Sequence, residues 1–353
     1  MDEKINGFDL LKKEVIDRGI CSGCRACIAV CSKGIISFED EKPSLNSYNE
    51  KDCYDCELCY SVCPRSSQML DEIEAYIGNQ EIIGPTIKIC SGKSKLEEVR
   101  TGAQDGGIVT SILLDLFDYH FIDGAIVIKN ENWMAKPVLI TDRNELVQCE
   151  GTVYAYNSPL QLFKEYEKIK NKIKEIKHGV DLPRLAIVGL PCQIKAIRKM
   201  KLLSPGEGII PSDLILITIG LFCFENFDYK RFISLITKKA QIDLNEIVKM
   251  DISSGKLYLN QSDGSQKSIP VKDLSDAMRN GCSFCKDFTN KFADISVGSV
   301  GSSSGYSTVI IRTEIGEKFY THTLLNDYIL EKALLPKDIN RIKKVGEIKF
   351  NKH

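Results

Sequence analysis

The chain has 353 residues, of which 43% are hydrophobic and 27% are charged, and its formal net charge at neutral pH is -1. This composition is ordinary for a globular protein, and the length exceeds one typical domain, so we expect two domains. The near-zero charge gives no reason to expect a nucleic acid partner. No apolar run approaches the ~20 residues needed to insert into a membrane.

Two cysteine runs with the same spacing lie near the N-terminus and use eight of the fourteen cysteines. The spacing C-x2-C-x2-C-x3-C is that of a bacterial iron-sulfur ligand set, in which three thiolates wrap one cubane and the fourth binds the neighbouring cluster. We therefore assign one [4Fe-4S] cluster to Cys21, Cys24, Cys27 and Cys63. A second [4Fe-4S] cluster is assigned to Cys31, Cys53, Cys56 and Cys59.

Zinc and disulfides are the alternatives for these eight cysteines. Zinc sites use two C-x2-C pairs rather than two runs of four cysteines. The N-terminal residues do not resemble a signal peptide, and thiols stay reduced in the cytoplasm, where we expect the chain. Ser32 follows Cys31 where the usual pattern has proline, which bears on the local turn more than on ligation. The runs predict a ferredoxin-like electron-transfer domain over residues 1–75.

The segment after the second run is acidic and then broken by Gly84-Pro85, which indicates a linker over residues 76–100. From there apolar runs alternate with amphipathic stretches. Helices are expected over 107–119, 160–177, 193–200 and 229–239, and strands over 124–128, 184–188, 214–221 and 294–297. This alternation favours an α/β domain over residues 101–345.

A hairpin signal interrupts this alternation. Lys256-Leu-Tyr-Leu-Asn and Lys267-Ser-Ile-Pro-Val flank a turn that contains Asp263-Gly264. We expect these strands to join the others, which would make the sheet of the larger domain a mixed one.

Four of the remaining cysteines could form a third metal site. Cys192 follows the strand expected over 184–188, Cys223 ends the strand after it, and Cys282-Ser-Phe-Cys285 adds a spaced pair in a polar loop. Strand ends of an α/β sheet open onto one crevice, so the four can meet there. A third cubane, a zinc site, a redox dithiol and buried hydrophobic cysteines all remain open on spacing alone.

Two glycine-rich segments are candidate cofactor loops. Gly102-Ala-Gln-Asp-Gly-Gly107-Ile-Val-Thr110 opens a helix, whose N-terminal N-H groups can take an anion such as a pyrophosphate. Gly298-Ser-Val-Gly301-Ser-Ser-Ser-Gly305 follows an expected strand and can cradle phosphates or a ring system. Ordinary turns are the alternative for both.

At these residues the chain resembles the beta-subunit family of coenzyme F420 hydrogenases and dehydrogenases. The resemblance spans roughly residues 100 to 320. Its motifs are Gly102 to Ser111, Asn130-Glu-Asn-Trp133, Gly189-Leu-Pro-Cys-Gln193, Gly220-Leu-Phe-Cys-Phe-Glu-Asn226, Gly281-Cys-Ser-Phe-Cys285, Phe292 to Gly301 and Arg312 to Lys318. The fused two-cluster module is most similar in layout to the electron-input subunits of F420H2 dehydrogenases of methanogenic archaea.

The resemblance implies an F420-dependent oxidoreductase that binds FAD and exchanges hydride with coenzyme F420 as substrate. It also implies a third [4Fe-4S] cluster, with Cys192, Cys223, Cys282 and Cys285 as ligands. Electrons would pass to or from other redox subunits of a complex or a soluble ferredoxin, which would hold the chain peripherally at any membrane. The alternatives are a formate dehydrogenase or hydrogenase beta subunit, or a ferredoxin-linked flavin reductase of another small molecule.

The resemblance also suggests which residues bind FAD, and it implies no catalytic side chain because the flavin ring carries the hydride. The expected FAD-binding residues are Gly102, Gln104, Asp105, Gly106, Gly107, Thr110, Asn132, Thr152, Tyr154, Gly298, Ser299 and Gly301. Thr152 and Tyr154 are alternatively ordinary strand residues, and Asp105 a helix cap.

The chain departs from the family pattern at two positions. Relatives have a basic residue where this chain has Val153, which removes a possible cofactor contact. They have Asp-Gly-Trp where it has Ser304-Gly305-Tyr306, which keeps an aromatic ring for stacking. Both departures bear on the preference for F420 more than on FAD.

Overall fold

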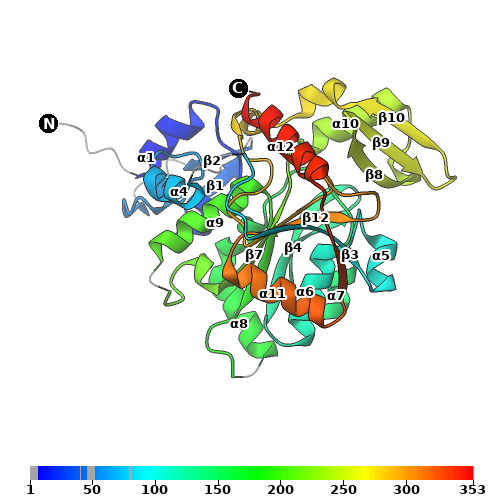
Figure 1. Ribbon diagram of the computed structural model, residues 1–353. Coiled ribbons are helices and arrows are strands. Elements are labelled where there is room, and N and C mark those ends of the chain that lie inside the picture. The colour runs from blue at the N-terminus through cyan, green and yellow to red at the C-terminus, as the bar shows by residue number, and fades with distance from the viewer. Residues whose placement is uncertain are drawn as a thin grey trace.

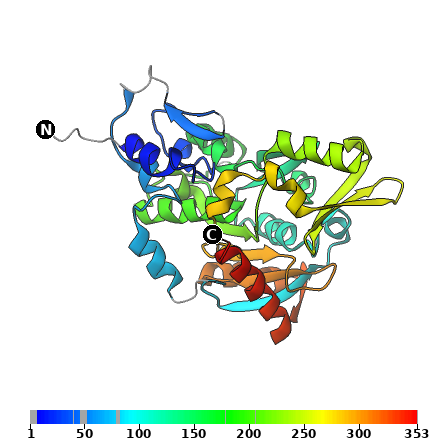
Figure 2. The same cartoon turned by 90° about the horizontal axis from the view of Figure 1, so that it is seen from above.

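The computed structural model describes residues 7–39, 41–45, 52–78, 82–177, 179–204 and 206–352. An N-terminal module and a small lobe lie at different ends of a large central sheet (Figures 1 and 2). Residues 1–6, where no signal peptide was recognised, lie outside these ranges. Within them, no helix combines the length and the apolar character that a membrane span requires.

An eight-stranded mixed sheet lies at the centre, in the order β13-β3-β12-β11-β7-β6-β4-β5. Neighbours among β11, β7, β6 and β4 pair in parallel, whereas β3, β5, β12 and β13 make antiparallel pairs. The strands are β3 (Lys88–Ser94), β4 (Gly124–Glu131), β5 (Met134–Ile140), β6 (Leu185–Gly189), β7 (Ile215–Leu221), β11 (Ile295–Gly298), β12 (Ser307–Ile311) and β13 (Ile329–Ala333). The mixed α/β sheet is confirmed, and its parallel strands are the four that the sequence predicted.

Helices cover both faces of this sheet because its strands alternate apolar side chains between the faces. Ala186 and Val188 of β6 pack in one core with α6 (Ile108–Asp118) and α11 (Glu314–Leu325). Leu185 and Ile187 pack in another with α8 (Tyr166–Ile176) and α9 (Pro191–Leu203). The helix expected over 160–177 is divided, because Pro159–Glu165 forms a 3-10 turn before α8. The remaining helices of this part are α5 (Glu97–Gly102), α7 (Arg143–Val147) and α12 (Pro336–Phe350).

The N-terminal module repeats in structure what the cysteine runs repeat in sequence. Its short helices α2 (Ala26–Ala29) and α3 (Leu58–Ser61) each begin after a left-handed residue, Arg25 (φ 62) or Glu57 (φ 57). Each of these residues directly follows the second cysteine of its run, so both runs turn in the same way. The module also contains α1 (Gly7–Leu11), α4 (Leu70–Ile77), β1 (Ile36–Glu39) and β2 (Lys42–Leu45).

The module docks on the sheet through the α9 face. Cys24, Ala26, Val62 and Ile73 of the module belong to the same apolar core as α9. In Figure 1 the module lies beside α9, so the cysteine runs are held close to the loops that follow β6 and β7.

The expected hairpin forms, but the expectation that it joins the large sheet is wrong. β9 (Lys256–Gln261) and β10 (Gln266–Pro270) pair across the turn at Gly264 (φ 83). Together with β8 (Ile247–Ser253) they form a separate three-stranded sheet. Their inward side chains pack on α10 (Tyr229–Ala240), so the lobe has a hydrophobic core separate from those of the large sheet.

Strand β3 corrects the expectation of a linker over residues 76–100. It lies inside the large sheet, between β12 and β13, and pairs antiparallel with both. Its sequence Lys-Ile-Cys-Ser-Gly-Lys-Ser is short and polar, so it lacks the apolar pattern by which a strand is recognised in a sequence. The larger domain therefore begins in structure before residue 101.

Candidate cluster and cofactor sites

The first four assigned cysteines line one cavity in the N-terminal module, and we call them the first set. They are Cys21, Cys24, Cys27 and Cys63. All but Cys21 are buried, and the backbone N-H of Gly23 donates to Cys21 Sγ at 3.4 Å. Such contacts to ligand sulfurs tune iron-sulfur clusters. The structure brings together the four side chains that the run spacing predicted.

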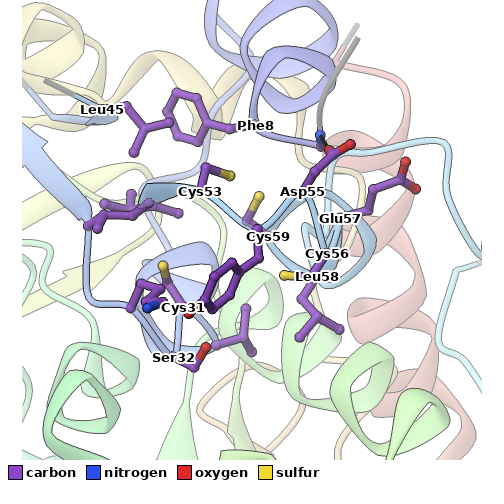
Figure 3. A pocket seen from close by; sticks show the side chains of 16 residues that line it. Phe8, Cys31, Ser32, Leu45, Cys53, Asp55, Cys56, Glu57, Leu58 and Cys59 are labelled. Atoms are coloured by element: carbon purple, nitrogen blue, oxygen red, sulfur yellow. Dashed lines mark hydrogen bonds between the residues drawn. The ribbon is translucent and has the colours of Figure 1, made fainter. Parts of the chain in front are cut away.

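The second four assigned cysteines line another cavity, and we call them the second set. Figure 3 shows Cys31, Cys53, Cys56 and Cys59 around one space, with Phe8 and Leu45 beside them. Cys56 is exposed, and the neighbouring Tyr54 retains 71% of its accessible surface. The second set therefore lies at the molecular surface.

The other four candidates meet at the carboxyl edge of the parallel strands, and we call them the third set. Cys192 lies in the first turn of α9 after β6, and Cys223 follows β7. Cys282 and Cys285 come from the 3-10 turn Asn280–Phe284 and the residue after it. Burial, followed by the nearby thiols of Cys285 and Cys282, raises the pKa of Cys192 to about 11.

A zinc ion and an iron-sulfur cluster place different demands on the positions of their ligand sulfurs. With Zn-S bonds of about 2.3 Å, a tetrahedral zinc site holds its sulfurs within about 4 Å of each other. Among the described residues, no three His, Cys, Asp or Glu side chains are arranged to hold a single metal ion. A cubane separates its ligand sulfurs more widely because each is bonded to a different iron atom.

Burial raises the pKa of at least one thiol in each of the three sets, and such thiols need a bound metal centre to become good ligands. Burial raises the pKa of Cys63 to about 11 and, together with the nearby Cys56, raises that of Cys59 to about 12. A thiol with so high a pKa stays protonated at neutral pH and is a poor ligand by itself. A metal centre deprotonates such thiols when it binds, so their burial fits cluster ligation.

The first set lies between the other two. Burial is the main cause that raises the pKa of Cys24, and two neighbouring thiols raise it further. They are Cys63 of the first set and Cys192 of the third set. The pKa of Cys27 is likewise raised first by burial, and Cys59 of the second set contributes. The three sets thus follow one another in the order second, first, third.

Backbone contacts join the first and third sets directly. Gly281 packs so closely against the Cys21 carbonyl that no Cβ would fit there. Arg65, two residues after Cys63, donates to the carbonyls of Phe284 at 2.5 Å and Gly281 at 3.0 Å. The loop that carries Cys282 and the loop that carries Cys21 are therefore in contact.

The first glycine-rich segment packs against the lobe. Gln104 Nε2 donates to the Met250 carbonyl at 3.1 Å and to Asp251 Oδ1 at 3.2 Å, both in β8. Burial raises the pKa of Asp105, and the neighbouring Asp251 raises it further. Tyr154 joins the same group, because its hydroxyl accepts the N-H of Ile252 at 3.0 Å. The structure thus brings Gln104, Asp105 and Tyr154 together around β8.

Packing explains two of the predicted glycines. A Cβ on Gly106 would collide with the Gly92 carbonyl and the Ser307 N-H, and a Cβ on Gly298 would collide with the Phe222 ring. Gly298 pairs with Thr308 in the sheet, next to Ser307. Both glycine segments therefore meet at the start of β12.

The remaining predicted residues are more dispersed. Gly102, Gly107 and Thr110 flank the start of α6, and Thr152 lies two residues before Tyr154. Ser299 and Gly301 (φ 102) follow β11. Asn132 (φ 52) lies in the β4-β5 turn, where its carbonyl accepts the Tyr229 hydroxyl at 3.2 Å. The structure places Asn132 beside α10 of the lobe.

The two departures from the family pattern lie apart. Val153 adjoins Tyr154 in the chain, whereas the Tyr306 ring already has a cationic neighbour. Lys332 Nζ lies 3.5 Å from the centroid of that ring and donates to Ser303 Oγ at 2.9 Å. A cofactor ring that stacks on Tyr306 would share it with this lysine.

Glu150 is a candidate cofactor contact that the sequence reasoning missed. Its carboxylate lies against Gly102, and its Oε1 is buried without a hydrogen-bond partner. An orphaned acceptor beside a glycine loop fits a cofactor that carries hydroxyl donors, as FAD does. Its position directly before the Gly151-Thr-Val-Tyr154 motif was the signal that could have identified it.

Replacing Glu150 by glutamine is expected to change how stability depends on pH. Burial, reinforced by Glu98, raises the pKa of Glu150 from 4.5 to about 7. The folded state therefore binds more protons than the unfolded state between these values, and the wild type loses stability as pH rises through this window. After a discount for solvent screening, the loss is about 1 kcal/mol.

Anaerobic thermal melts of the wild type and E150Q at pH 5, 6, 7 and 8 measure this effect. The advantage of E150Q should grow across the series and level off above pH 7. A difference that does not vary with pH would contradict the assignment.

Comparisons with known proteins match most of the chain. Residues 20–67 match the family model of 4Fe-4S dicluster domains. Two further models describe the N-terminal and C-terminal parts of the coenzyme F420 hydrogenase/dehydrogenase beta chain. Residues 89–164 match the first of these two models, and residues 182–337 match the second.

Three individual proteins illustrate the similarity. An uncharacterized protein of Methanocaldococcus jannaschii is 35% identical, with 98% of this chain and 97% of that protein covered. A subunit of the F420H2 dehydrogenase of Methanosarcina mazei is 34% identical, with 87% and 83% covered. A solved chain of the F420-reducing [NiFe] hydrogenase complex from Methanosarcina barkeri is 31% identical, with a TM-score of 0.69 and 78% and 92% covered.

Proposed function

This chain belongs to the coenzyme F420 hydrogenase/dehydrogenase beta-subunit family, and from this we propose that it is an iron-sulfur flavoprotein subunit of an F420-dependent oxidoreductase. It exchanges hydride with coenzyme F420 through FAD. It passes single electrons through three [4Fe-4S] clusters to or from a partner. The two N-terminal clusters rest on the dicluster match, and the third cluster and the flavin are our extension.

One observation carries this proposal: the three cysteine sets form a series that begins at the sheet edge and ends at the surface. The third set lies at the carboxyl ends of β6 and β7, the edge where α/β sheets bind ligands. The second set includes the exposed Cys56. A series with one buried end and one exposed end is what a path between a bound cofactor and an external partner requires.

FAD would supply the chemistry that links the two kinds of carrier, because it accepts one hydride, which carries two electrons, and releases these electrons one at a time. The side chains of this protein position and shield the carriers. Gln104 and Tyr154 hold the first glycine segment and the segment after Gly151 against β8. The buried Cys24, Cys27 and Cys63 keep water from the middle of the path.

The exposed side of the second set is the proposed contact for the electron partner. Tyr54 is largely exposed beside Cys56, and Lys33 Nζ lies 4.1 Å from the centroid of its ring. The partner is another redox subunit of a complex or a soluble ferredoxin. Subunits of this type occur in the dehydrogenase and hydrogenase complexes named above.

Cofactor quantification after anaerobic purification tests the proposal. About twelve irons, about twelve sulfides and one FAD per chain are expected, at four irons for each [4Fe-4S] cluster. Intact clusters without flavin would instead indicate an electron-relay subunit that does not react with F420. About eight irons would contradict the third cluster.

A further inference from the structure

Arg279 occupies the gap between the first and third cysteine sets. Its carbonyl accepts the N-H of Cys282 at 2.9 Å, so its backbone leads directly into the third set. Its guanidinium packs against Gly23 so closely that a Cβ there would collide with Nη2. Gly23 is the residue whose N-H donates to Cys21 Sγ. One side chain therefore spans from the third set to the loop of the first.

The charge of this guanidinium is incompletely compensated by protein groups. Arg279 is only 5% exposed, and its Nε has no hydrogen-bond partner. Its nearest carboxylate is Glu41, whose Oε1 lies 3.9 Å from Nε, and the Glu41 side chain is itself 38% exposed. A buried cation is costly unless an anion pairs with it. The thiols of Cys21, Cys192 and Cys282 also lie within electrostatic range of it, and the nearby Arg25 guanidinium adds a second positive charge.

Tyr156 connects the same arginine to the third set. The Arg279 Cζ atom lies 3.8 Å from the centroid of the Tyr156 ring. The Tyr156 hydroxyl lies 3.9 Å from Cys192 Sγ, within the range of a hydrogen bond to sulfur. A phenol hydroxyl carries one proton that it can donate, so at this distance Tyr156 can donate a hydrogen bond to a Cys192 thiolate.

We propose that Arg279 and Tyr156 form an electrostatic bridge that raises the reduction potentials of the clusters on both sides of it. A reduced cluster carries one more negative charge than an oxidised cluster, so a buried guanidinium beside it favours reduction. Tyr156 acts on the third set alone, through its hydroxyl. Both are positioning residues, because they act on the clusters without ligating iron.

This inference rests on the clusters of the proposed function but not on F420. Wild-type protein without a third-cluster signal would contradict the proposed function itself. Wild-type protein with that signal, and variants without a shift, would contradict only the bridge. The two failures are thus distinguishable in one set of samples.

The test is an anaerobic redox titration followed by electron paramagnetic resonance on the complete chain. The third-cluster signal is identified by its loss in Cys223→Ala. Arg279→Gln should make the reduction equilibria of the first-set and third-set clusters tenfold less favourable. For a one-electron couple, this change lowers each reduction potential by 59 mV. Arg279→Lys keeps the charge and should give a smaller shift.

Two further variants complete the experiment. Tyr156→Phe should lower only the third-set potential, because the ring beneath Arg279 is kept and the hydroxyl is lost. Arg231→Gln is the matched control, since Arg231 also pairs with Glu41, at 3.3 Å, yet its side chain is 47% exposed. It should leave all potentials unchanged.

Unchanged potentials in Arg279→Gln with full iron content would overturn the bridge. If Arg279→Gln loses iron, its cluster potentials no longer test the proposal, and Tyr156→Phe is the variant that does. A third-set potential equal to that of the wild type in this variant would then overturn the proposal, and a selective shift would support it.

Discussion

Replacing Cys223 by alanine is expected to remove about four of about twelve irons, four for each [4Fe-4S] cluster, and to leave the two N-terminal clusters in place. Cys223 follows β7, and its carbonyl accepts Lys349 Nζ at 2.5 Å, so the backbone stays anchored without the thiol. The series of clusters would lose the member nearest the sheet edge. Electron delivery from F420H2 to a one-electron acceptor should then fall to background, while the bound flavin is still reduced.

Iron quantification and a viologen-reduction assay measure these two effects. Cys149→Ser is the matched control, because Cys149 is only partly buried and lies outside the three sets. Cys90 is less suitable, since its thiol is the partner of the Tyr320 hydroxyl at 3.2 Å in the core. Full iron content in Cys223→Ala would contradict the assignment of Cys223 as a ligand.

Replacing Lys199 by methionine is expected to be the most destabilising change at the boundary between the module and the sheet. Lys199 lies in α9 and is only 1% exposed. Its Nζ donates to the carbonyls of Cys63 at 2.8 Å and Gln68 at 2.7 Å, and to Ser66 Oγ at 3.0 Å. Methionine would leave these acceptors buried and unpaired, with a loss of about 3–5 kcal/mol.

Anaerobic unfolding in guanidinium chloride, monitored by iron release to a chelator, measures this loss. Because Cys63 belongs to the first set, that cluster should be released first. Lys174→Met on the exposed side of α8 is the control and should stay within about 0.5 kcal/mol of the wild type. Equal unfolding midpoints for Lys199→Met and the wild type would show that Lys199 does not hold the module.

The sequence predicted how the cysteines of each run group in space, because ligand spacing is a local property. A tight C-x2-C-x2-C loop constrains its own geometry, so the first and second sets could be assigned without a fold. The third set required one further step, namely that Cys192 and Cys223 follow parallel strands and therefore meet at one edge. The structure brings each set together as assigned.

The order of the three sets was not accessible from the sequence. It depends on how the module docks on α9, and that docking combines a shared apolar core with polar contacts between distant residues. Arg65 and Lys199 make such contacts, yet they resemble ordinary surface residues in the sequence. Arg279 and Tyr156 lie in no periodic pattern, so their convergence also becomes visible only in the structure.

The two errors in the fold have related causes. The short strand β3 is rich in serine and lysine, so its composition resembles a linker although it is paired on both sides. The hairpin of β9 and β10 was recognised from local signals, but such signals do not specify which sheet a hairpin joins. The hairpin packs on α10, and this packing places it in the separate sheet of the lobe.

Rapid anaerobic mixing of the purified protein with F420H2 tests the central claim most directly. Stopped-flow spectra should show bleaching of the flavin absorbance first, followed by reduction of the iron-sulfur clusters, before any partner is added. In Cys223→Ala only the first phase should remain. If F420H2 leaves the flavin absorbance of the wild type unchanged, F420 is not the substrate, and the chain is a reductase for another molecule.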